Sequence, residues 1–118
     1  MKWIEHKGKK ILYCDMRNLD SKQIVALMRE TDIQILASSG KLLYLGNVEG
    51  AGVSREVMQE ARRLTATSRR TKFDKLAAVG VRGTKAIFLN ALVAMFGKGG
   101  AEIRPFDTEE EAKDWLAE

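Results

Sequence analysis

The alternation of apolar and polar residues near the start of the chain predicts a hairpin followed by a helix. Residues 3–16 alternate around Lys7-Gly8-Lys9, which is typical of two antiparallel strands joined by a tight turn. Apolar residues then return every three or four positions over 21–37. Asp20 and Gln23 stand at the spacing of an N-cap and its reciprocal partner, so we expect the helix to begin after Asp20.

The middle of the chain alternates between strand and helix patterns. An apolar run over 42–48 predicts a buried strand, and helical spacing follows Ser54. The small and β-branched run 76–81 suits a strand that is covered on both faces. Residues 84–96 predict a third helix, which we expect to end at the glycines of 97–100.

The last part of the chain predicts a short strand and a short helix. Residues 102–106 contain Pro105, which lacks a backbone N–H and therefore favours an edge position. The sequence from Thr108 to Glu111 is typical of a capping box. The order β-β-α-β-α-β-α-β-α over 1–118 predicts a single α/β domain with an N-terminal hairpin, a mostly parallel central sheet and helices packed on it.

Composition narrows the classes of protein and of site. The 118 residues can bury a core without a disulfide, and one Cys with one His cannot supply a zinc site. We therefore expect no metal and no cofactor. We expect Cys14 to be buried and His6, at the hairpin, to be solvated. The chain meets charge at once and has no long apolar stretch, so we expect a cytoplasmic protein without a transmembrane segment.

The segment after strand 42–48 is the first candidate site. Its glycines form a turn at the carboxyl end of a strand, where ligands and partners usually bind in an open α/β sheet. Ser54 is expected to cap the next helix rather than to serve as a phosphosite. The residues that we expect to contact a partner here are Asn47, Glu49, Gly50, Gly52 and Ser54.

Charge is unevenly distributed. Residues 55–75 hold seven basic and three acidic side chains, whereas residues 102–118 hold two basic and seven acidic ones. A solvated helix face explains the basic cluster, and a patch for an anion, an anionic lipid or an acidic partner is the alternative. Nucleic acid is not expected, because no aromatic residues are interleaved with the basic ones. The candidate patch is Arg62, Arg63, Arg69 and Arg70.

The turn before helix 84–96 is a weaker candidate for anion binding. Gly80 to Lys85 lacks the spacing of a phosphate-binding loop. The N-terminus of the helix could still hold an anion with help from Arg82 or Lys85.

Helix 84–96 is apolar around its whole circumference. Only Asn90 is polar within residues 86–96, and a sheet can cover only part of such a helix. Neighbouring helices, a second copy or protein partner, a lipophilic ligand, and a membrane surface contacted peripherally are the four coverings that fit. The side chains expected to line an apolar pocket or interface are Phe88, Leu92, Met95 and Phe96.

Three motifs in this order resemble the STAS domain, the fold of bacterial anti-sigma-factor antagonists, and more closely its SpoIIAA-like branch. They are the turn Asn47 to Val53, the strand-to-helix segment Ala78 to Gly83, and the ending Phe106 to Leu116. The resemblance covers essentially the whole chain. The SpoIIAA-like branch is sometimes grouped with the lipid-carrying SEC14 (CRAL-TRIO) domains, which adds weight to a lipophilic ligand.

The resemblance implies a regulatory module that binds a protein. In similar antagonists the turn reads Asp-Ser-Ser-Gly-Leu-Gly, and its second serine is phosphorylated to switch binding off. Here Glu49 occupies that position, and a carboxylate gives a permanent, weaker charge than a phosphate. We therefore expect a non-enzymatic interaction module, because no nucleophile, base and orienting group can be assembled. The alternative is a carrier or sensor of a lipophilic molecule in a pocket covered by helix 84–96.

Overall fold

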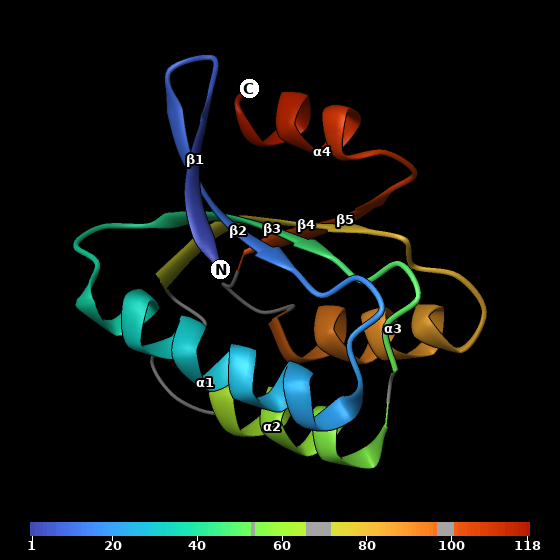
Figure 1. The fold of residues 1–118 in the computed structure, drawn as a ribbon. Helices are drawn as coiled ribbons and strands as arrows, with labels where there is room; N and C mark the ends of the chain where they lie inside the picture. The colour runs from blue at the N-terminus through green and yellow to red at the C-terminus, as the bar shows by residue number, and fades with distance from the viewer. Residues whose placement is uncertain (53, 66–71, 97–100) are drawn as a thin grey trace.

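The protein is a five-stranded sheet with four helices in the described residues, which are 1–52, 54–65, 72–96 and 101–118 of a computed structural model. The order of elements confirms the expected β-β-α-β-α-β-α-β-α (Figure 1). The elements are β1 (Lys2–His6), β2 (Lys9–Asp15), α1 (Ser21–Ala37), β3 (Leu42–Asn47), α2 (Arg55–Thr65), β4 (Phe73–Val79), α3 (Thr84–Phe96), β5 (Glu102–Phe106) and α4 (Glu109–Leu116).

The strands lie in the order β1-β2-β3-β4-β5, and only the β1–β2 pair is antiparallel. Helices α1, α2 and α3 cover one face of the sheet, and α4 lies on the other (Figure 1). The carboxyl ends of β2 to β5 therefore meet at one edge, which holds the turn after Asn47. As expected, β5 with Pro105 is an edge strand.

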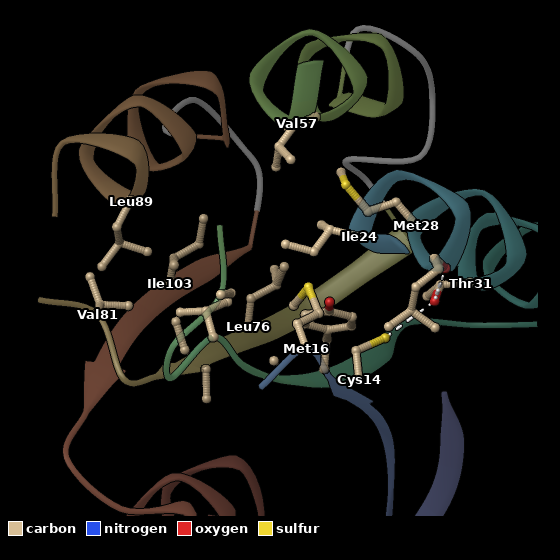
Figure 2. A pocket seen from close by; sticks show the side chains of 18 of the residues that line it. Cys14, Met16, Ile24, Met28, Thr31, Val57, Leu76, Val81, Leu89 and Ile103 are labelled. Atoms are coloured by element: carbon tan, nitrogen blue, oxygen red, sulfur yellow. Dashed lines mark hydrogen bonds between the residues drawn. The ribbon is translucent and has the colours of Figure 1, made fainter. Parts of the chain in front are cut away.

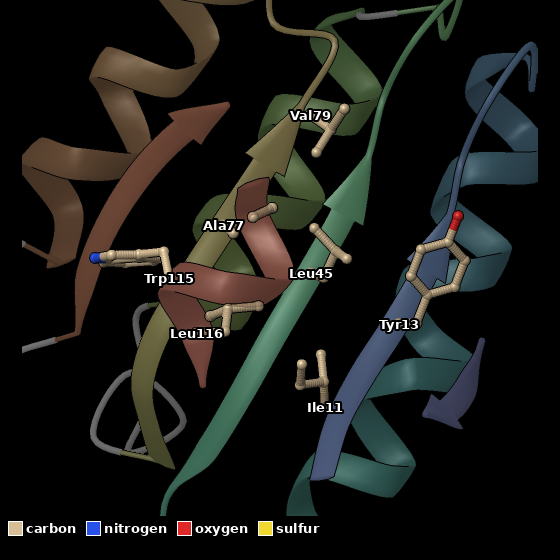
Figure 3. Packing of buried hydrophobic residues seen from close by; sticks show 8 residues of the cluster. Ile11, Tyr13, Leu45, Ala77, Val79, Trp115 and Leu116 are labelled. Carbon is tan, nitrogen blue, oxygen red and sulfur yellow. The ribbon is translucent and has the colours of Figure 1, made fainter. Parts of the chain in front are cut away.

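The α4 face of the sheet holds one compact core. Trp115 and Leu116 of α4 pack on the middle strands, and Leu116 is only 1% exposed (Figure 3). The Trp115 ring also lies 5.4 Å from the Phe106 ring and beneath the cations of Lys75 and Arg104. The buried residues of this core are Ile11, Tyr13, Leu45, Ala77, Val79, Ala112, Trp115 and Leu116.

The other face packs against the three remaining helices. A capping box fixes the start of α1, because Asp20 accepts from the Gln23 N–H while Gln23 accepts from the Asp20 N–H. The Glu60 carboxylate of α2 accepts from Arg29 of α1 and from Arg63 of α2. The residues of the two buried hydrophobic clusters on this face are Leu12, Cys14, Met16, Ile24, Ile35, Leu42, Ala51, Val57 and Phe73.

Both ends of β4 differ from those expected, and β3 ends at Asn47, one residue before the expected 48. Strand β4 begins at Phe73 rather than at residue 76, because polar residues precede its apolar run and Lys75 donates to the Trp115 carbonyl at 3.0 Å. It ends at Val79 rather than at residue 81, because Gly80 takes a φ of +83° that breaks the extended backbone. The glycines of 97–100, at which we expected helix 84–96 to end, lie outside the described residues.

Two side-chain expectations are also corrected. His6 is not fully solvated: its Nε2 lies 2.7 Å from Asp114 Oδ1 of α4, and its side chain is 18% exposed. Thr108 caps α4 by accepting from the Glu111 N–H at 3.2 Å, but the Glu111 carboxylate accepts from the Thr108 hydroxyl rather than from its backbone. The His6 contact ties α4 to the N-terminal hairpin, whereas the Thr108 contacts fix the first turn of α4.

Candidate functional site

An apolar cavity of about 170 Å³ lies between the sheet and helices α1, α2 and α3. Ile24 and Met28 reach it from α1, Val57 from α2 and Leu89 from α3 (Figure 2). The strands contribute Cys14, Tyr44, Gly46, Leu76, Ala78 and Ile103. Protein interiors rarely leave voids of this size, and an apolar cavity of about 150 Å³ is enough to bind benzene.

Small residues around the cavity explain why the three helices leave it open. Gly46 of β3, Ala51 of the following turn and Ala61 of α2 all line it. A Cβ at Gly46 would lie 3.1 Å from both Met16 Cε and Tyr44 Cε1, so a side chain at this wall would require those two side chains to shift. The cavity is thus formed by residues too small to fill the space between the helices and the sheet.

The polar groups on the α1 side of the cavity are paired within the protein. Cys14 Sγ lies 3.2 Å from Thr31 Oγ1, which donates to the Leu27 carbonyl at 2.7 Å. Burial raises the pKa of the Cys14 thiol despite the opposing hydrogen bonds of Thr31 and Tyr44. Burial likewise raises the pKa of Tyr44 well above its ordinary value. Cys14 is buried, as expected, and a neutral, buried thiol is a poor nucleophile.

The turn after β3 is held by a polar cluster that joins three elements. Asn47, 5% exposed, donates from Nδ2 to Glu109 Oε2 at 2.6 Å, and the Tyr13 hydroxyl donates to the same oxygen. Asn47 Oδ1 accepts from the Glu49 N–H at 3.1 Å. Asn47 therefore links its own turn to the first residue of α4, and its side chain is not available at the surface.

The same cluster sets the charge of Glu109. Burial raises the pKa of Glu109, but the hydrogen bonds of Asn47 and Tyr13 and the charges of Arg17 and Lys113 outweigh it, so this pKa lies below its ordinary value. Burial and the Glu109 carboxylate raise the pKa of Tyr13. Glu109 is thus an anion that accepts two hydrogen bonds, beside a polar hollow of about 790 Å³ between β1, β2, α1 and α4.

The remaining turn residues lie closer to the surface. Glu49, Gly50 and Gly52 are exposed. A Cβ at Gly50 would lie 2.1 Å from Asn18 Oδ1, so the turn packs tightly on the loop that follows β2. Ser54 caps α2 as expected, because its Oγ accepts from the Val57 N–H at 3.4 Å. Partner binding at this turn stays a prediction.

The basic patch is only partly described. Arg62 is exposed, whereas Arg63 pairs with the buried Glu60 at 2.6 Å. The hydrogen bond from Arg63 is the main reason that the pKa of Glu60 lies below its ordinary value. Arg69 and Arg70 lie outside the described residues. The structure therefore gives Arg63 a role in holding α2 together, and anion binding by this patch stays a prediction.

Helix α3 has one face on the cavity and one face exposed. Leu89 is buried, whereas Ile87 is 71% and Val93 42% exposed. The backbone bounds of α3 match the expected 84–96. The side chains expected to line its apolar surface, those of Phe88, Leu92, Met95 and Phe96, lie outside the described residues.

Sequence reasoning missed the partners of Asn47 and most of the cavity wall. Tyr13 and Glu109 are 96 residues apart, and no local pattern connects them. Met28 and Thr31 have ordinary helical spacing, which predicts burial but not an empty space beside it. Two features of the sequence do point to a cavity. They are the apolar helix over 84–96 and the small residues Gly46, Ala51 and Ala61.

The parallel strands, the helices on both faces and the turn at the carboxyl ends of the strands define an α/β domain. The SpoIIAA-like family profile matches residues 2–117, and the chain belongs to this family. A crystal structure of an uncharacterised protein with a SpoIIAA-like fold from Shewanella loihica is similar, with a TM-score of 0.65 and 15% identity over 98% of this chain and 90% of that one. No curated protein matches this sequence.

The described residues contain neither a helix that could span a membrane nor a cluster of metal ligands. None of the helices in these ranges is long and apolar enough to cross a bilayer. Within the same ranges, no three His, Cys, Asp or Glu side chains gather as ligands for a metal ion.

Proposed function

We propose that this protein is a binding module of the SpoIIAA-like family that holds a small apolar ligand between its sheet and helices α1, α2 and α3. The observation that carries the proposal is the cavity of about 170 Å³, which is lined almost entirely by aliphatic, aromatic and sulfur-containing side chains. Burial of apolar surface supplies the binding free energy, at roughly 25 cal/mol per Å². Binding rather than catalysis is supported, since the thiol in the wall is neutral and paired.

Native mass spectrometry of the freshly purified protein, with denaturing extraction of anything bound, tests the proposal. A monomer with a small adduct that the extraction releases is the expected result. Ala78 lines the cavity, so Ala78→Phe should fill it and abolish the adduct. Ala37→Phe, the same change at an exposed position of α1, should keep the adduct. An adduct that survives in Ala78→Phe would contradict binding in this cavity.

A protein partner is the second candidate, and the exposed face of α3 favours it. Ile87 and Val93 are large apolar side chains that solvent reaches in the single chain. Such side chains often mark an association surface. The exposed Glu49 gives the neighbouring turn a fixed charge in place of a phosphorylatable serine, so this binding would not be switched by phosphorylation there.

The same mass spectra separate the two candidates. A dimer without a small molecule would favour association through α3, and Ile87→Lys should then return the protein to a monomer. A ligand-bearing monomer that Ile87→Lys leaves unchanged would place the function in the cavity.

A further inference from the structure

Among the residues that line the cavity, Lys85 and Asp32 are the charged ones. Asp32 lies on α1, is 7% exposed and is already engaged in an interaction within the protein. Lys85 is half-buried in the first turn of α3. Within the described part of the chain, its ammonium has no carboxylate partner. The cavity therefore contains one cation whose counter-ion the described residues do not supply.

Lys85 lines the same cavity as the apolar side chain of Leu89 on α3. Leu89 follows four residues later, so the two side chains share one face of α3. Val81, four residues before, also lines the cavity, beside Leu89 (Figure 2). The long apolar stem of a lysine can lie along such surface while its ammonium stays at the rim.

The backbone adds positive potential at the same place. The N–H groups of Lys85 and Ala86 bond to the carbonyls of Arg82 and Gly83, which begins the helical ladder of α3. The N-terminus of a helix carries a partial positive charge that favours anions within its first turn. Arg82 is exposed just outside this turn. A ligand at the rim thus meets a helix terminus and the Lys85 ammonium together.

We propose that the ligand is a small monocarboxylate, with its apolar body in the cavity and its carboxylate on the ammonium of Lys85. This proposal rests on the proposed function and names the class of ligand for it. An ammonium at the rim of an apolar cavity can pair with a carboxylate, and the charge-assisted hydrogen bond between them is stronger than a neutral one. A dianion would leave one negative charge unpaired in a cavity that already holds Asp32. The volume suits a body about the size of benzene or a short alkyl chain.

The protein is titrated with octanoate, with 1-octanol as the neutral control and with octyl phosphate as the dianionic control. Calorimetry measures the affinities, and NMR chemical shifts of the cavity residues report the site of binding. Charge-assisted hydrogen bonds are stronger than neutral ones, so octanoate should bind about tenfold more tightly than 1-octanol. Lys85→Gln should remove that preference and leave the affinity for 1-octanol unchanged. Lys22→Gln, at an exposed position of α1, should keep it.

The outcomes distinguish the two proposals. If octanoate and 1-octanol bind equally, or if Lys85→Gln retains the preference, the ligand class is wrong while the cavity still functions. If octyl phosphate binds more tightly than octanoate, the monoanion assignment is wrong. If neither octanoate nor 1-octanol binds or shifts cavity residues, the proposed function itself is overturned. The Lys85 ammonium has no hydrogen-bond or ion-pair partner among the described residues, so Lys85→Gln should unfold at the same temperature as the native chain.

Discussion

Glu109 shows how one side chain can fix the relation between distant parts of the chain. It accepts from Asn47 and Tyr13, which belong to neighbouring strands, and it begins the helix on the opposite face from the cavity. At neutral pH we expect Glu109→Gln to lower the free energy of unfolding by about 1–3 kcal/mol, since a neutral amide cannot accept both hydrogen bonds as strongly. Denaturation by urea measures this difference.

The effect of Glu109→Gln should depend on pH. Because the pKa of Glu109 is lower in the folded protein, its contribution is complete above the ordinary value of 4.5 and disappears as pH falls through the lowered value. The difference in unfolding free energy between the native chain and Glu109→Gln should therefore shrink as pH is lowered from 7 toward 3. Glu110→Gln, at an exposed position, should show no such trend. A difference that is constant with pH would contradict the assignment.

Gly80 supports a second prediction at the level of one residue. Its φ of +83° disfavours any side chain, and a Cβ there would lie 2.7 Å from the Glu49 backbone nitrogen. Gly8 has a similar φ of +79°, but its Cβ would meet nothing within 4 Å. Gly8→Ala should thus cost about 1 kcal/mol from backbone conformation alone, and Gly80→Ala should cost clearly more. Urea denaturation of both variants compares the two costs, and equal losses would show that the close approach to Glu49 is relieved.

At the scale of elements, α4 is the only described helix on its face of the sheet, so that core depends on few side chains. Leu116 is 1% exposed, and Leu116→Ala should lower the free energy of unfolding by about 2–5 kcal/mol. Leu36 on α1 is 49% exposed, so Leu36→Ala should cost under 1 kcal/mol. Thermal denaturation measures both changes. A small loss for Leu116→Ala would mean that the neighbouring Trp115 can close over the gap.

The order and bounds of the elements could be predicted because they depend on local signals. Asp20 with Gln23, the turn at Lys7-Gly8 and the helical spacing after Ser54 each act over a few residues. The start of β4 could not be predicted in the same way. The Lys75 ammonium there donates to a carbonyl 40 residues away along the chain. This hydrogen bond allows a charged residue inside a strand, and the local sequence pattern gives no sign of it.

For the whole molecule, ligand binding should appear as added stability. A ligand that binds only the folded protein adds about 2.7 kcal/mol at one hundred times its dissociation constant. Octanoate at that concentration should raise the melting temperature by several degrees, whereas the Ala78→Phe variant should not respond. Differential scanning calorimetry measures both. An equal rise in Ala78→Phe would place the bound octanoate outside the cavity.

The candidate site was predictable only in part, because a cavity depends on the distances between elements. The apolar circumference of helix 84–96 predicted that another element, a partner, a ligand or a membrane covers it. Lys85 was a weak candidate for binding an anion. The empty space depends on Gly46, Ala51 and Ala61 coming together from three segments. Sequence periodicity reports which face of a helix is apolar, but not how far that face stands from the sheet.

The position of α4 also determines when the protein can become native during synthesis. Ile11 and Leu45, on the face of the sheet that α4 covers, are synthesised early. Trp115 and Leu116, which cover this face, are synthesised more than one hundred residues after Ile11. At about 5–20 residues per second, this apolar face waits for several seconds while the remaining elements leave the ribosome. A nascent chain stalled before α4 should therefore bind chaperones. The chaperones should dissociate once α4 has emerged from the ribosome.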